Sequence, residues 1–486
     1  MASAGEGPAT DLLAARRRKL DALRAEGIEP FPHAFPGVEP IGAVKAPHDE
    51  LPAGEDSTAR ARVAGRLAAR RGQGKAAFLD LVDRSGRLQL HAQRDVLGEE
   101  AFERLLSLDL GDLIGVDGLV FRSRRGELSL RVESFTVLAK SLRPPPEKHH
   151  GLTDVETRFR RRELDLMANE DTREAFMTRA KVITAIRRSL DADGFVEVET
   201  PILQPIYGGA AARPFTTHFN ALDRMMYLRI ATELYLKRCI VGGLERVYEI
   251  GKNFRNEGLS FKHNPEFTVL EWYEAYADYD DVAARCERLL AGVAQAVGHE
   301  GEIDFSAPWR RETLAGAIES RAGVEILAHR DREALVAAMR DRDIEVPPDD
   351  TWAQLVDFLL SRYVEPELIQ PTFLFDYPVE LSPLAKAHRE HPGLTERWEA
   401  FAGGMEFANA FTELNDPDEQ RRRFEAQAAA AEAGDEEAQP YDEAFVTALE
   451  HGMPPTGGIG IGIDRLVMLI TGLRSIREVV LFPAMR

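Results

Sequence analysis

Charged and polar side chains crowd the segment ERVYEIGKNFRNEGLSFKHNPEFTVLEWY, residues 245–273. Its apolar ends have the composition of strands, and Arg255, Glu257, His263 and Asn264 lie in the stretch between them. A purely structural turn does not need so many polar groups, whereas the planar guanidinium of Arg255 suits a phosphate or a carboxylate. The segment therefore predicts two strands joined by a polar loop that binds an anionic group.

A second set of chemically active residues lies near the carboxyl end. In RWEAFAGGMEFANAFTELND, polar residues interleave with aromatic ones in a strand-like run: Glu399, Glu406, Asn409 and Glu413. Carboxylates that converge in a dry site need Mg²⁺ or an ammonium group, and salt bridges within a sheet are the alternative. The glycine-rich segment 457–465 lacks the GxGxxG spacing, and no GxxxxGKS/T loop occurs, so a nucleotide would be bound in another way.

Several elements must position these residues. Residues 173–191 predict a helix with one apolar face, which runs into a strand at 195–201. Earlier in the chain, five short strand-like runs fill 61–138, with a helix at 99–107 after the third. This order is that of an OB-fold, a barrel that binds single-stranded nucleic acid. Phe78 would lie either outward on the binding face or inward in the barrel core.

Composition sets limits on the possible functions. The 486 residues suffice for two or three domains, and 44% hydrophobic with 29% charged residues is ordinary for a globular protein. The net charge of −20 argues against nucleic acid, yet residues 60–76 form a basic stripe with six Arg and Lys and no acid. We interpret the stripe as a solvated face, with nucleic-acid contact as the alternative. The two cysteines lack metal-site or disulfide spacing and fit a cytoplasmic setting, and no apolar run is long enough for a membrane span.

Three motifs in this order resemble motifs 1, 2 and 3 of the class II aminoacyl-tRNA synthetases: 173–201, 245–273, and 397–416 together with 457–465. The strings GGAAARPFTTHFNALD, ATELYLKR, NAFTELND and VVLFPAMR are similar to those of the bacterial lysyl-tRNA synthetases. The resemblance implies an α+β fold, in which a five-stranded OB-fold barrel that reads the anticodon precedes a catalytic domain with an antiparallel sheet flanked by helices. It also implies a homodimer that uses L-lysine, ATP, Mg²⁺ and tRNA(Lys).

Through the same resemblance, ATP is bound by residues of motifs 2 and 3: Arg255, Glu257, His263, Asn264, Phe267, Glu399, Glu406 and Arg465. Arg255 would hold the α-phosphate and the lysine carboxylate during an in-line displacement, which is electrostatic catalysis without a protein nucleophile. Phe267 would stack on adenine, and Arg465 would close the opposite face. Glu399 and Glu406 match the carboxylates that bind Mg²⁺ in the family.

The implied amino-acid pocket is acidic, whereas a pocket for aspartate would need a cation. The implied roles are Gly209 and Glu233 for the α-amino group, Asn409 for the carboxylate, Phe411 for the methylene stem, and Glu271, Tyr273 and Glu413 for the side-chain ammonium group. In the barrel, the positions that match those holding the central anticodon base are Phe78, Gln89 and Glu127.

The implied organisation has four parts: a helix and lead-in at 1–60, the OB-fold domain at 61–142, a proline-rich connector at 143–151, and the catalytic domain at 152–486 with a helical insertion near 306–365. An aspartyl- or asparaginyl-tRNA synthetase is the nearest alternative, which the acidic pocket disfavours. A protein lysyltransferase and a noncatalytic RNA-binding regulator are the others. The chain departs from the family pattern at Glu163, Phe407 and Ala408, and the first departure puts in doubt an interdomain or dimer contact.

Overall fold

The structure is a computed structural model that describes residues 7–72, 74–146, 151–348, 351–432 and 439–485. The chain divides into two compact units, Met1–Thr153 and Asp154–Arg486. The expected connector at 143–151 lies within the first unit, just before this division, and its residues 147–150 lie outside the described residues. No helix in the described part of the chain is long and apolar enough to cross a membrane.

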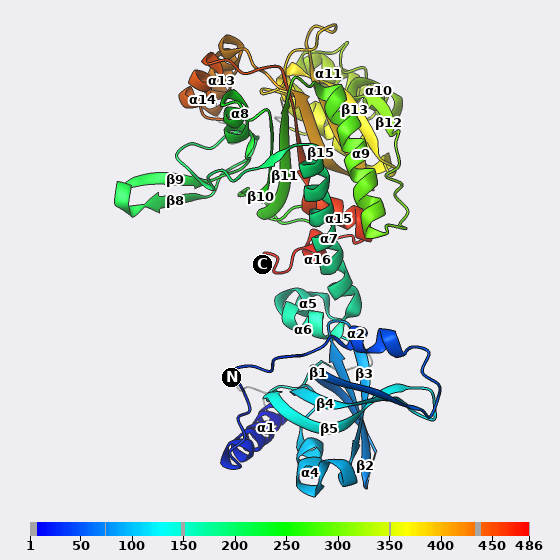
Figure 1. Ribbon diagram of the computed structural model, residues 1–486. Coiled ribbons are helices and arrows are strands. Elements are labelled where there is room, and N and C mark those ends of the chain that lie inside the picture. Colours follow the sequence, from blue (N-terminus) through cyan, green and yellow to red (C-terminus); the bar gives the residue numbers. More distant parts are fainter. Residues whose placement is uncertain (1–6, 73, 147–150, 349–350, 433–438, 486) are drawn as a thin grey trace. The chain divides into compact units, whose positions relative to one another are not determined.

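Five strands of the first unit close into a barrel in the order β1-β2-β3-β5-β4 (Figure 1). They are β1 (Asp56–Arg71), β2 (Ala76–Asp83), β3 (Gly86–Gln93), β4 (Leu113–Arg122) and β5 (Leu128–Ala139). The helices of this unit are α1 (Gly7–Ala25), α2 (Ile41–Lys45), α3 (Arg94–Leu97) and α4 (Glu99–Ser107). The predicted OB-fold, with its helix after the third strand, is confirmed.

Alternation along β2 decides the position of Phe78. Ala77, Leu79 and Leu81 are buried in the barrel core, whereas Phe78 points outward and is partly exposed. The alternative position of Phe78 in the core is therefore excluded.

Most side chains of the basic stripe form ion pairs or hydrogen bonds within the barrel unit. Three of its side chains pair with carboxylates on other strands at 3.0–3.2 Å: Arg60, Arg62 and Arg71. Arg66 and Arg70 donate to backbone carbonyl groups. These contacts account for most of the stripe without a nucleic-acid ligand.

The second unit is built on an eight-stranded sheet with the order β12-β13-β14-β15-β16-β11-β10-β6 (Figure 1). Its strands are β6 (Val196–Glu197), β10 (Arg246–Phe254), β11 (Glu266–Ala275), β12 (Arg310–Thr313), β13 (Thr372–Pro378), β14 (Leu394–Ala402), β15 (Met405–Thr412) and β16 (Thr456–Gly462). The six central strands pair antiparallel, as expected. The edge strands β6 and β12 instead pair in parallel, because helices lie in the connections to their partners.

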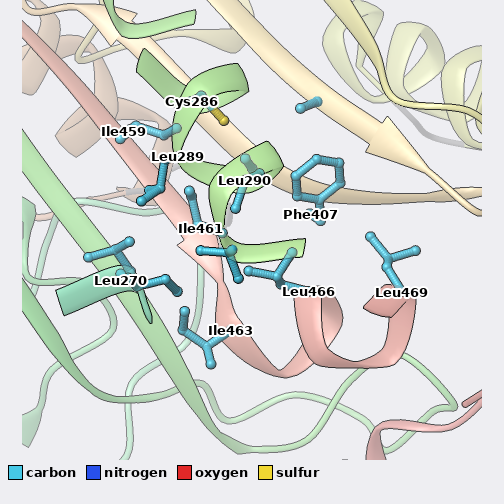
Figure 2. Packing of buried hydrophobic residues seen from close by; sticks show 14 of the residues in the cluster. Leu270, Cys286, Leu289, Leu290, Phe407, Ile459, Ile461, Ile463, Leu466 and Leu469 are labelled. Carbon is cyan, nitrogen blue, oxygen red and sulfur yellow. The ribbon is translucent and has the colours of Figure 1, made fainter. Parts of the chain in front are cut away.

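Helices surround this sheet, and a small sheet lies beside it in the order β7-β9-β8. The helices are α5 (Val155–Arg160), α6 (Arg162–Ala168), α7 (Glu170–Ala192), α8 (Glu233–Val241), α9 (Tyr279–Val297), α13 (Pro417–Glu432), α14 (Glu443–Glu450), α15 (Ile463–Thr471) and α16 (Ile476–Val479). The small strands are β7 (Leu203–Gln204), β8 (Thr216–Phe219) and β9 (Arg224–Leu228). The main apolar core lies between the large sheet and α7, α9 and α15, where Leu270, Ile461 and Leu466 pack with Leu290 (Figure 2).

The described part of the segment 306–365 contains β12 and three α-helices, α10 (Leu314–Ala322), α11 (Arg332–Arg340) and α12 (Trp352–Leu359). These helices bury their own apolar cluster, which is continuous with Leu374 and Tyr377 of β13. The insertion is therefore packed onto the sheet and does not form a separate body.

Candidate active site

A cavity of about 640 Å³ opens on the large sheet of the second unit. Its walls include residues of α8, α12, α15, β10, β11, β14, β15, β16 and the loop between β10 and β11. All of the ATP and lysine residues carried over from the family line it, from Gly209 to Arg465. Segments that lie more than two hundred positions apart thus meet in one site of a size suited to a small-molecule ligand.

The polar loop between β10 and β11 presents Arg255 to this cavity. The Arg255 guanidinium lies 5.1 Å from the centre of the Phe267 ring, and its Nε donates to the carbonyl oxygen of Ile230 at 3.4 Å. Among the described residues, no carboxylate forms an ion pair with Arg255. The guanidinium is therefore held in place while its positive charge stays available for an anionic ligand.

His263 joins this loop to the first turn of α15. Its Nε2 accepts from the Arg465 guanidinium at 3.2 Å, and its Nδ1 lies 2.8 Å from the Ser260 hydroxyl. Burial, followed by the positive charges of Arg465 and Lys262, lowers the pKa of His263 to about 4. The imidazole is therefore neutral near pH 7, as its acceptor role toward Arg465 requires.

Glu257 and Asn264 occupy different environments in the same loop. Glu257 is exposed, and Asn264 is buried. The Asn264 side chain donates to the carbonyl oxygen of Glu266 at 2.5 Å and accepts from the backbone nitrogen of Ala484 at 3.3 Å. Asn264 thus also anchors the carboxyl-terminal segment to the loop.

The segment expected as one strand-like run is a hairpin. Gly403 and Gly404 turn the chain between β14 and β15 with φ values of 57° and 72°, which glycine adopts without strain. The hairpin places Glu399 of β14 opposite Asn409 of β15. Residues ten positions apart in the sequence thereby become neighbours in the cavity wall.

Glu399 and Glu406 fit a divalent cation that arrives with a phosphate group. Both line the cavity, although each is paired with an arginine, Arg397 at 2.5 Å and Arg465 at 3.0 Å. Burial raises the pKa of Glu399, and the charge of Glu406 adds to this while Arg397 opposes it. The described residues hold no group of three or more His, Cys, Asp or Glu arranged for a metal ion. Mg²⁺ commonly uses one or two protein carboxylates together with substrate phosphates, so the pair is sufficient.

Buried carboxylates gather at the other end of the cavity. Glu271 accepts from the backbone nitrogen of Thr232 at 3.1 Å and from the Tyr273 hydroxyl at 3.2 Å. Burial, with the charge of Glu233 adding to it, raises the pKa of Glu271 to about 7. Burial also raises the pKa of Glu413, and its Oε1 has no hydrogen-bond partner in the described part of the chain. This end of the cavity favours a cationic ligand.

Two glycines make room for these carboxylates. A Cβ atom at Gly458 of β16 would overlap Glu413 Oε1 and the Tyr273 ring. Gly209 has a φ of 88°, and a Cβ there would lie 3.1 Å from the Cβ of Glu233. The glycine-rich strand therefore shapes the acidic end of the cavity and does not act as a phosphate loop.

Three charged residues at or beside the cavity were not predicted. Arg397 donates to Asn409 Oδ1 at 3.1 Å, and its guanidinium lies 5.5 Å from the Phe411 ring centre. Asp357 of α12 also lines the cavity, although its surrounding sequence reads as an ordinary apolar helix. Lys237 could have been noticed, because it follows Glu233 by four residues on one helix face.

The residues expected to read the anticodon share the outer face of the barrel. Phe78 and His91 are cross-strand partners on β2 and β3, with ring centroids 4.6 Å apart and planes 7° apart. The Ser129 hydroxyl lies 3.1 Å from both Gln89 Oε1 and the carbonyl oxygen of Glu127, while the Glu127 side chain is exposed. His91, which was not predicted, extends the aromatic surface of Phe78.

Of the three departures from the family pattern, Phe407 lines the cavity, whereas Ala408 and Glu163 do not. Phe407 and Ala408 are buried in β15, where Phe407 packs against Trp309 with ring centroids 6.0 Å apart. Glu163 is exposed on α6 and pairs with Arg161 at 2.6 Å.

Comparison with known proteins assigns both units. Residues 154–486 match the family described as tRNA synthetases class II (D, K and N), and residues 61–138 match the OB-fold nucleic acid binding domain. A protein of Moorella thermoacetica named lysine–tRNA ligase is 52% identical over 483 residues, which cover 98% of this chain and 98% of that protein. A lysine–tRNA ligase of Bacillus subtilis is 49% identical over 486 residues, covering 98% of this chain and 97% of the relative. The chain therefore belongs to the lysine–tRNA ligase family of the class II tRNA synthetases.

Proposed function

We propose that the protein activates L-lysine with ATP and transfers it to tRNA(Lys). In the first step a lysine carboxylate oxygen attacks the α-phosphorus of ATP, which forms lysyl-adenylate and releases pyrophosphate. In the second, a terminal ribose hydroxyl of the tRNA attacks the lysyl carbonyl carbon and releases AMP. The main support for lysine as the substrate is the acidic end of the cavity, which is lined by three buried carboxylates: Glu233, Glu271 and Glu413.

The residues of the loop and of α15 support the activation step. Arg255 stabilises the charge that develops on the α-phosphate, and its fixed position avoids reorganisation during the reaction. Arg465 lies beside the neutral His263 and faces the same cavity. Glu399 and Glu406 would hold Mg²⁺, which spreads the charge of the ATP phosphates when bound.

The first unit supports tRNA as the second substrate. Phe78, Gln89 and Glu127 lie on the outer face of an OB-fold barrel, the face on which such barrels bind single strands. The outward ring of Phe78 can stack on a nucleobase. We assign this face to the anticodon, and we place the protein in the cytoplasm, where tRNA charging supplies the ribosome.

A homodimer is part of the same proposal. Exposed apolar side chains gather on the segment that follows α7 and on the small sheet: Val196, Ile202, Leu203, Phe219, Leu222 and Met225. Exposed apolar side chains that cluster on a protein surface mark interaction sites. We propose that a second copy of the chain covers it.

The test of the proposed function is ATP–pyrophosphate exchange with each of the twenty amino acids, measured beside tRNA charging. We expect exchange that depends on lysine and charging of tRNA(Lys). Exchange driven by aspartate or asparagine would replace the proposal with the neighbouring members of the family. Lysine-dependent exchange without tRNA charging would point to a protein lysyltransferase.

Glu413→Gln and Glu271→Gln each remove a charge from the acidic end of the cavity. We expect the KM for lysine to rise about tenfold or more in each variant, because a hydrogen bond to a charged group is worth about 1.5 to 3 kcal/mol. The KM for ATP should change little.

In the parent protein, kcat/KM for lysine should fall as the pH drops through about 7, because protonated Glu271 no longer attracts an ammonium group.

Glu274→Gln is the matched control for these two variants. Glu274 is buried on β11, as Glu271 is, but it lies on the opposite face of that strand and pairs with Arg285 at 2.9 Å. Its replacement should leave the KM for lysine and its pH dependence unchanged. An equal loss of ATP affinity in Glu413→Gln and Glu271→Gln would indicate a general defect and contradict their assignment to lysine.

A further inference from the structure

Lys237 of α8 is a fully buried cation beside the acidic end of the cavity. Its side chain has a relative exposure of 0%, and its Nζ lies 2.6 Å from Glu233 Oε1. The same Nζ forms a second ion pair with Oε2 of the buried Glu413 and lies 6.0 Å from the centre of the Tyr273 ring. One ammonium group thus connects two carboxylates that come from distant parts of the chain.

A purely structural role does not account for this arrangement. Burying an ion pair carries a large desolvation penalty, and apolar residues of similar volume often replace such pairs without loss of stability. The buried residues of α8 other than this ion pair are apolar: Leu234, Leu236 and Ile240 join a cluster with Phe445 and Leu449 of α14. A charge in this place is better explained by the site that its partners line.

The charges of the pocket balance when lysine occupies it. Glu233, Glu271 and Glu413 together carry three negative charges when ionised, and Lys237 compensates one of them. A lysine molecule brings two ammonium groups, and its carboxylate faces Arg255 in the proposed reaction. With Lys237 present the filled pocket is therefore neutral, whereas without Lys237 one buried carboxylate would have no counter-ion.

We propose that Lys237 is a positioning residue that holds Glu233 and Glu413 in place and sets the charge of the pocket to match the two ammonium groups of lysine. The inference rests on the proposed lysine activation and deepens it. Lys237 acts through the two glutamates and does not itself contact the substrate.

The electrostatic surroundings of Lys237 agree with this role. Burial alone would lower the pKa of Lys237, but the attraction of Glu233 and Glu413 outweighs burial and raises it. From β11, Glu271 and Tyr273 belong to the same group of interacting side chains. On β10, Glu249 is already paired with Arg229. Lys237 is therefore charged, and its charge acts on the carboxylates of the pocket.

The test is Lys237→Met, which keeps the length of the side chain and removes its charge. We expect the KM for lysine in pyrophosphate exchange to rise about tenfold or more, with little change in the KM for ATP. We also expect the acid limb of kcat/KM for lysine to move to higher pH, because a carboxylate that loses a neighbouring cation ionises less readily. An unchanged KM for lysine and an unchanged acid limb would overturn the proposal, as would equal losses for both substrates.

Lys140→Met is a matched control for the loss of a buried lysine. Lys140 of the first unit also has a side-chain exposure of 0%, and it bridges Asp109 at 2.7 Å and Asp112 at 2.9 Å. Its replacement should destabilise the barrel unit and leave the lysine kinetics of exchange as in the parent protein. A similar shift of the acid limb in Lys140→Met would overturn the specific role of Lys237.

Lys237→Arg keeps the proposal testable if Lys237→Met does not fold. The arginine retains the charge, so the acid limb should stay where the parent protein has it, even if the larger side chain raises the KM for lysine. Displacement of the limb in this variant would overturn the charge role. The proposed function and this inference can fail separately. If the parent protein shows no lysine-dependent exchange, the proposed function is refuted. If the parent protein shows normal exchange and the Lys237 variants have the same kinetics as the parent, only this inference is refuted.

Discussion

Arg255→Ala should reduce lysine-dependent pyrophosphate exchange by about 10²- to 10³-fold, the usual effect of removing one preorganised donor to transition-state charge. Arg255 is the guanidinium in the loop that no described carboxylate neutralises, and the Phe267 ring lies 5.1 Å below it. The alanine variant loses the charge that we propose acts on the α-phosphate. The surrounding strands β10 and β11 keep their pairing, so the variant should remain folded.

The control for this variant is Arg255→Lys, which keeps a positive charge but not the planar fork. Its activity should lie between those of the parent and the alanine variant. Circular dichroism and thermal unfolding, measured in parallel, would show whether the fold is retained. A loss below about tenfold in a folded Arg255→Ala variant would remove Arg255 from the mechanism.

The fold could be predicted from local sequence patterns to a large extent. Strands β1 and β3 of the barrel alternate clearly, and Ala77, Leu79 and Leu81 of β2 are all buried, as a period of two requires. The parallel pairing of β6 and β12 could not be predicted, because it depends on where distant segments return to the sheet. The sequence pattern predicted one strand-like run where the structure has the hairpin of β14 and β15, although the Gly403–Gly404 pair in the sequence is typical of a turn.

The candidate site was predicted mainly through the family resemblance, which supplied residues that the structure brings into one cavity. Arg397 was not predicted because it acts on other side chains of the protein, and such contacts have no signature in a single sequence. Lys237 does have one signature, its spacing of four residues from Glu233 on the same helix. Asp357 shows the limit most clearly. It reaches the cavity from the insertion, whose apolar helices appear in the sequence as packing elements only.

Phe78→Ala should lower kcat/KM for tRNA by roughly 5- to 150-fold, because base–aromatic stacking is worth about 1 to 3 kcal/mol per base. Phe78 is partly exposed on the outer face of the barrel and already stacks on His91 at 4.6 Å. Removal of the ring therefore takes away a preformed platform and leaves the barrel core intact. Lysine-dependent exchange should be unaffected, since the activation residues all belong to the second unit.

Two further variants distinguish stacking from other effects of the missing ring. Phe78→Leu keeps an apolar side chain, so it should lose nearly as much tRNA charging as Phe78→Ala if the contact is stacking, and much less if any apolar group suffices. Phe35→Ala removes another partly exposed ring of the same unit, which packs under Arg62 with 3.9 Å between guanidinium and ring centre. It should change the unfolding temperature without changing kcat/KM for tRNA.

Because Phe78 faces outward, Phe78→Ala should also cost less stability than truncation of a buried phenylalanine, which costs about 3 to 5 kcal/mol. Unchanged charging in Phe78→Ala would show that the anticodon lies elsewhere on the barrel.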